Sequence, residues 1–285
     1  MNKQIWQIAF VFAFSSLGPL YLGGWEVFRS FSRYGSWGLF GLLLAAGSLS
    51  WGAYQLSRSS HQHDARNIRQ LLAVLLGPAA APFFSFVLHL LVLVFAAKIT
   101  ADLAQKLQTA GFLPFAVGVL LILALLWQLT GRIDWRRLML LSGWAILLGL
   151  AVHAFFYLDM RPVRLPSLLY QLNANWLWAS LQYIGLHLLL LTPVAVMLAK
   201  QTAGDARLLK HGIIRGGGIF TLLLLLAHLA IQSHWHDVHD AELPLYQVLR
   251  EAFAPALPFY LALDWLYGFL SILLWLFCLV GLLSG

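Results

Sequence analysis

The sequence predicts an all-α membrane protein whose chain crosses the bilayer about eight times. Composition is the first observation behind this prediction: 61% of the 285 residues are hydrophobic and only 10% are charged. A soluble domain carries about 25% charged residues. The second observation is that apolar runs of about 20 residues, the length that spans a bilayer as a helix, recur along the whole chain. The mean hydropathy of +0.79 agrees with both.

The predicted spans are separated by short connections, so we expect one transmembrane domain over residues 1–285 and no separate soluble domain. The chain holds a single cysteine, Cys278, which excludes an intrachain disulfide. The spans are expected near residues 5–29, 36–56, 79–103, 112–130, 137–158, 174–199, 212–233 and 254–283.

The basic residues predict the orientation. Most of the 18 Lys and Arg fall in segments that share a side with the N-terminus, so the positive-inside rule predicts a cytoplasmic N-terminus. The first apolar run lacks a basic region ahead of it and a clear cleavage site, so we expect a retained helix. The net charge of +7 does not predict nucleic-acid binding, because the basic residues form no stripe.

The first span carries the most informative motif, from Phe14 to Glu26. Pro19 cannot donate a backbone hydrogen bond, and three glycines lower helix propensity around it. Unpaired backbone is tolerated in a membrane only beside protein or a wet cavity, and many transporters use such breaks to hold a substrate. We therefore predict a broken helix whose substrate-binding residues are Ser15, Ser16, Gly18, Pro19, Tyr21, Gly23 and Gly24. The alternative is a simple proline kink with close helix packing.

Ionisable residues inside predicted spans are the other candidates. Such residues are costly in lipid, so they usually face a partner or a cavity. Glu26 and Asp264 are therefore predicted to couple transport to protons, since removal from water favours the neutral form of a carboxyl group. The outer loop at residues 234–239 is rich in histidine, but we interpret it as a hydrated loop and predict no metal site there. Four histidines lie within spans, and as haem or metal ligands they would define an alternative function: His89, His153, His187 and His228.

The first span also resembles the opening of YkvI-type bacterial membrane proteins, in which a broken glycine-rich helix ends in a Gly-Gln-Glu element. Here Gly18, Gly24 and Glu26 match, and Trp25 replaces the glutamine. Later similarities cover the segments Phe28–Gly38, Trp178–Met197, Lys210–Gly218, Glu242–Leu245 and Tyr260–Ser271.

The resemblance implies a bundle similar to the LeuT-like fold, with substrate and ions at breaks in the first and sixth helices. It marks Tyr183 and His187 on the sixth span as substrate-facing, and His187 and Ser271 as coupling residues. The chain is expected to lack the last two helices of that fold. The asparagine and paired threonines of the family are altered at His187 and Ser271, which favours a proton over sodium as the coupling ion.

Together these observations predict a secondary transporter of the bacterial inner membrane. We expect it to carry a small polar solute such as an amino acid, without a bound cofactor. No soluble catalytic constellation is present, so an enzyme is not expected. Two alternatives remain open: the intramembrane haem or metal protein, and a non-transporting subunit of a larger complex.

Overall fold

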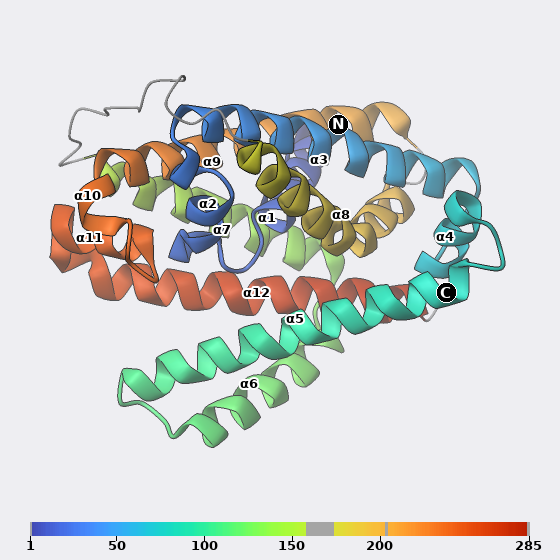
Figure 1. The fold of residues 1–285 in the computed structure, drawn as a ribbon. Coiled ribbons are helices and arrows are strands. Elements are labelled where there is room, and N and C mark those ends of the chain that lie inside the picture. The colour runs from blue at the N-terminus through green and yellow to red at the C-terminus, as the bar shows by residue number, and fades with distance from the viewer. Residues whose placement is uncertain (1, 158–173, 203–204, 284–285) are drawn as a thin grey trace.

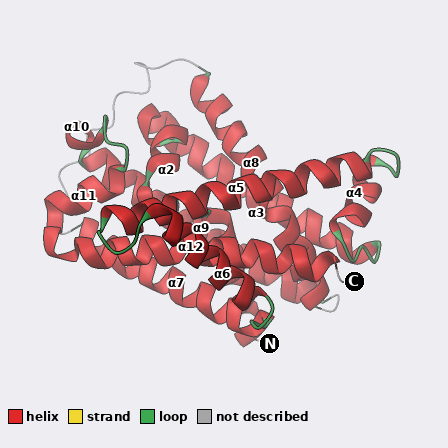
Figure 2. Cartoon of the chain, turned by 90° about the horizontal axis from the view of Figure 1, so that it is seen from below, coloured by secondary structure: helices red, strands yellow, loops and turns green. Residues whose placement is uncertain are grey.

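The structure is a computed structural model that describes residues 2–157, 174–202 and 205–283, and every regular element in these ranges is a helix (Figures 1 and 2). The broken first segment comprises α1 (Asn2–Leu17), η1 (Tyr21–Gly23), α2 (Trp25–Ser30) and η2 (Ser32–Tyr34). The longer helices are α3 (Ser36–Gln62), α5 (Ala81–Thr109), α6 (Phe115–Thr130), α7 (Trp135–Phe156), α8 (Asn175–Gln201), α9 (Ala206–Ser233) and α12 (Leu257–Leu283). The short ones are α4 (Ile68–Leu76), α10 (Trp235–Val238), α11 (Pro244–Phe253) and η4 (Ala254–Ala256).

The helices agree with a polytopic membrane protein. Six helical segments of the described chain are long and apolar enough to cross a membrane: α3, α5, α7, α8, α9 and the segment Pro244–Leu282 that contains α12. The predicted spans near 5–29 and 112–130 correspond to shorter helices, because α1 and α6 have 16 residues each. That the chain crosses the membrane about eight times therefore remains a prediction.

Several boundaries differ from those predicted. α3 continues six residues beyond the predicted end at 56, to Gln62. α9 begins at Ala206, because the Asp205 side chain accepts hydrogen bonds from the first backbone N–H groups. The helices α4, α10 and α11 were not predicted, since they are too short to give a membrane-span signal.

Small residues set the packing around α1. A side chain at Gly216 of α9 would place its Cβ atom 2.5 Å from the Ala9 carbonyl oxygen of α1. Gly212, one turn earlier, has its Cβ position 2.5 Å from the Ile8 side chain. This small-xxx-small spacing lets the two backbones approach, as in other transmembrane helix pairs.

The helices α5 and α6 form an antiparallel hairpin that lies along α12 at one edge of the bundle (Figure 1). Many of their large apolar side chains are exposed, such as Trp127 at 85% and Phe86 at 66%. Exposed apolar surface on this scale would aggregate in water, so it indicates a lipid environment.

Candidate functional site at the break in the first span

The first span is interrupted between Leu17 and Trp25. Gly18 has φ +75° and Gly24 has φ +77°, a left-handed conformation that side chains other than glycine rarely adopt. Between them Pro19 cannot continue the backbone hydrogen bonding, and a single 3-10 turn follows at Tyr21–Gly23. The break thus occupies the residues whose composition predicted it.

Polar atoms without partners lie beside this break. Ser16 Oγ and Glu26 Oε2 are inaccessible to solvent and have no hydrogen-bond partner among the described residues. Ser15, in contrast, donates to the Val11 carbonyl 2.7 Å away within its own helix. Buried polar atoms are normally paired, so an unpaired one on each side of the break suggests a binding function.

The sixth span contributes His187 to the same place. His187 Nε2 lies 3.7 Å from Glu26 Oε2, and its ring stacks on Tyr183 at 3.8 Å between ring centroids. A Cβ atom at Gly18 would lie 3.2 Å from His187 Nε2. Glycine at position 18 therefore allows both the turn and the approach of the histidine.

The hydrogen bonding of His187 determines what the pair can do. Its Nδ1 lies 3.0 Å from the Tyr183 carbonyl oxygen, which only accepts, so Nδ1 carries a proton. In a neutral ring Nε2 then presents a lone pair to the Glu26 carboxylate. Two acceptors then face each other at 3.7 Å, and a proton on either group would remove their mutual repulsion. Lys98 of α5 also interacts electrostatically with Glu26.

Tyr21, in the turn of the break, connects two other helices. Its hydroxyl donates to the Leu223 carbonyl of α9 (2.6 Å) and lies 2.8 Å from His153 Nε2 of α7. His153 Nδ1 is 2.6 Å from the Gly149 carbonyl. The break is therefore held to α9 by the buried hydrogen bond of the Tyr21 hydroxyl and lies against His153 of α7.

One face of α12 lines the other side of the break. Tyr260, Asp264, Tyr267 and Ser271 are buried and spaced by four, three and four residues, as on one helical face. Tyr260 donates to the Leu22 carbonyl, and the Tyr267 ring lies 4.6 Å from that of Phe14 between centroids. Ser271 donates to the Tyr267 carbonyl within α12.

Asp264 forms an ion pair with Lys106 of α5. The sequence analysis did not identify this partner. The antiparallel order of α5 and α12 could have indicated it, because Lys106 stands near the end of one helix and Asp264 near the start of the other. Tyr267, whose hydroxyl is buried without a described partner, was also missed, although it shares the spacing of Asp264 and Ser271.

The sixth helix differs from what the family resemblance implied. α8 is helical without interruption from Asn175 to Gln201, with Pro193 inside it. Tyr183 and His187 therefore project from an intact helix rather than from a second break.

The four intramembrane histidines have separate partners. His89 is 2.6 Å from the Ser85 carbonyl, and His228 Nδ1 is 3.0 Å from Ser32 Oγ. Within the described ranges, no group of three or more His, Cys, Asp or Glu side chains could hold a metal ion. The histidine-rich segment contains the short helix α10, in which His236 is exposed, while the adjacent His234 is buried.

The fold and this break define, as a class, a multi-pass helical membrane protein with a polar interruption in its first segment. No family model matches the chain. The chain is similar to the uncharacterized membrane protein YkvI of Bacillus subtilis (strain 168), with 23% identity over 247 residues that cover 85% of this chain and 70% of the relative. This similarity supports a YkvI-like membrane protein.

Proposed function

We propose that the protein is a proton-coupled secondary transporter of a small polar solute such as an amino acid, in a bundle related to the LeuT-like fold. The observation that carries the proposal is the contact between Glu26 and His187 beside the non-helical backbone at Gly18. A pair that holds one exchangeable proton beside a non-helical turn would supply both parts of a symport site.

The solute would bind at the turn between Gly18 and Gly24. There the backbone has left the helix. The Tyr21 and Leu22 carbonyls accept from Gly24 and Tyr260, and the remaining polar groups of the turn would bind the carboxylate and ammonium groups of a solute. Ser16 Oγ is a further unpaired polar atom at this place. Binding of the proton and the solute at adjacent atoms would couple their movements, because each changes the charge that the other meets.

The proposal places the protein in the bacterial inner membrane with a cytoplasmic N-terminus, as the distribution of basic residues predicts. Asp264 remains a second candidate for proton coupling, with Lys106 as its partner. If Asp264 takes part in coupling, its protonation would break the ion pair with Lys106, and His187 would not be involved.

Reconstituted vesicles with an entrapped pH dye test the proposal. Addition of a mixture of proteinogenic amino acids should acidify the interior of vesicles that hold the wild-type protein. Glu26→Gln should abolish this signal, because the amide cannot release a proton. Glu242→Gln, which changes an exposed glutamate outside the break, should retain it. Solute uptake that does not respond to an imposed pH gradient, or that is equal in wild type and Glu26→Gln, would exclude proton coupling.

A further inference from the structure

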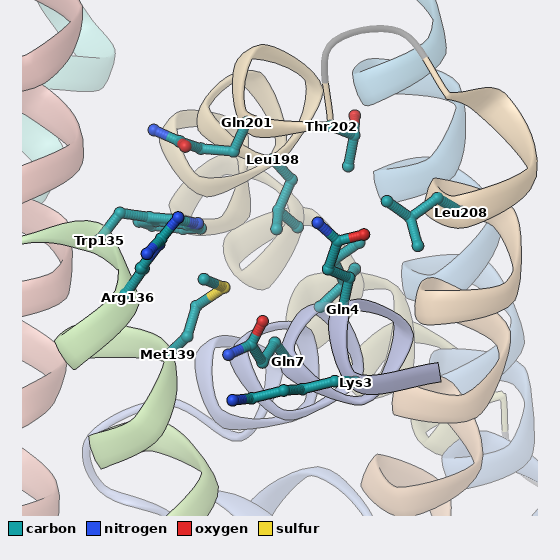
Figure 3. A pocket seen from close by; sticks show the side chains of 11 residues that line it. Lys3, Gln4, Gln7, Trp135, Arg136, Met139, Leu198, Gln201, Thr202 and Leu208 are labelled. Carbon is teal, nitrogen blue, oxygen red and sulfur yellow. The ribbon is translucent and has the colours of Figure 1, made fainter. Parts of the chain in front are cut away.

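A pocket of about 340 Å³ lies at the N-terminal end of α1, outside the site described above. Figure 3 shows the side chains that surround it, which come from the start of α1, the start of α7, the end of α8 and the start of α9. The starts of α1, α7 and α9 and the end of α8 therefore lie together on one side of the bundle. The volume falls in the range of small-molecule sites, about 300–1,000 Å³.

All the charged side chains that line this pocket are positive. Lys3 and Arg136 supply two cations, and the amides of Gln4, Gln7 and Gln201 add neutral hydrogen-bond donors. No carboxylate is among the residues that line it. A site built from cations and amides favours negatively charged oxygen atoms.

The two cations lack carboxylate partners in the described part of the chain, since neither forms an ion pair there. The nearest carboxylates in sequence are used as helix caps. Asp134 accepts from the Arg137 backbone N–H (2.7 Å), and Asp205 accepts from that of Leu208 (2.9 Å). The positive charge of the pocket is thus left for another anion.

The glutamine amides that line the pocket are also available to bind a ligand. Gln201 donates to the Met197 sulfur at 3.8 Å, and a thioether is a weak acceptor. Within the ranges that the structure describes, the side chains of Gln4 and Gln7 make no hydrogen bond. Several donors therefore converge on the pocket with little to bind inside the protein.

We propose that this pocket is an anion site, in which Lys3 and Arg136 bind carboxylate or phosphate oxygens and the glutamine amides orient them. A free anionic solute and the headgroup of an anionic phospholipid present the same chemistry. The inference goes beyond the transport proposal, because binding here is expected whether or not the protein carries a solute through the membrane.

The test compares the wild-type protein in detergent with Lys3→Gln/Arg136→Gln. Binding of inorganic phosphate and of succinate is measured by thermal shift at constant ionic strength, and binding of phosphatidylglycerol against phosphatidylcholine by native mass spectrometry. Loss of two charge-assisted contacts should weaken binding of the preferred probe about tenfold or more. The control Arg58→Gln/Arg69→Gln removes two exposed basic charges outside the pocket and should bind like wild type.

A second variant, Gln4→Leu/Gln7→Leu, keeps both charges and should also weaken binding. A selective loss for phosphate or succinate supports a soluble ligand, and a selective loss for phosphatidylglycerol supports a lipid headgroup. The proposal is overturned if phosphate, succinate and phosphatidylglycerol all fail to bind the wild type, or if the pocket and control variants lose binding equally. The dye experiment with Glu26→Gln does not depend on these residues, so failure of one proposal is distinguishable from failure of the other.

Discussion

Gly18 is the residue at which the first span leaves the helix, and two separate constraints act on it. Its φ of +75° lies in the left-handed region, and His187 Nε2 occupies the space next to its Cα atom. The first constraint concerns the backbone and the second the neighbouring helix, so no other residue type satisfies both without a shift.

We expect Gly18→Ala to destabilise the protein by about 1–2 kcal/mol from the backbone conformation alone, and to disturb the contact between His187 and Glu26. Its melting temperature in detergent should fall and solute-driven proton movement should weaken. The matched control is Gly218→Ala in α9, where an added Cβ meets no atom within 4 Å. Alanine in this helical position should leave stability equal or slightly higher. Equal melting temperatures for both variants would contradict the assignment.

Among single residues, those that form the break could be predicted from the sequence, whereas the contacts around the break mostly could not. Glycine and proline act through local backbone chemistry, which a sequence contains directly, so the interruption between Gly18 and Gly24 could be predicted. The approach of His187 to Glu26 depends on how two helices are rotated against each other, and only the family resemblance indicated it. Whether these residues bind a solute stays a prediction.

Among the contacts between helices, that of α5 with α12 is distinctive because it includes a partly buried ion pair. The Asp264 side chain is 7% exposed and that of Lys106 is 31% exposed. Removal of one partner leaves a buried charge unpaired, whereas removal of both leaves an apolar contact.

We therefore expect Lys106→Met to lower stability by about 3 kcal/mol, the lower end of the range for breaking a buried pair, since Lys106 is partly solvated. The double variant Lys106→Met/Asp264→Leu should regain most of this loss. Thermal unfolding of the wild type, both single variants and the double variant gives the coupling energy. Additive losses would show that the pair contributes no interaction of its own.

The pair α1 and α9 is held by close backbone approach. Gly216→Leu would insert a side chain against the Ala9 carbonyl and the Phe12 ring, so we expect a marked fall in melting temperature or loss of the folded protein. Gly218→Leu on the exposed face of the same helix is the control and should fold normally. If both variants melt alike, the two helices do not pack as described.

Long helices were predictable for a simple reason: a run of about 20 apolar residues has few alternatives in a membrane. The short helices could not be predicted from the sequence. α11 buries Leu245, Val248 and Leu249 and exposes Arg250, a pattern of helical period that is too brief to distinguish from a loop. The uninterrupted course of α8 past Pro193 was also not predictable, because neighbouring helices decide whether a proline breaks a helix in a membrane.

For the whole molecule, the number of crossings and the orientation are open to direct measurement. Cys278 is buried, so in a Cys278→Ala background a single new cysteine reports its own side of the membrane. We expect Gln70→Cys and Gly131→Cys to react with an impermeant maleimide only in inverted vesicles, and Gln108→Cys and Glu242→Cys only in intact cells. Reaction of positions 108 and 131 from the same side would show that α6 does not cross.

The helix α11 packs against η1 and α2 of the broken first segment, and this contact has a mechanical consequence. A Cβ atom at Gly24 would lie 2.6 Å from the Leu245 side chain, so α11 rests directly on the backbone of the break. Glu26 follows two residues later, and no flexible linker separates them. We therefore expect a binder applied to the exposed edge of α11 to displace the backbone next to the half-buried Glu26 carboxylate. An antibody fragment raised against that edge should lock the first segment in one position.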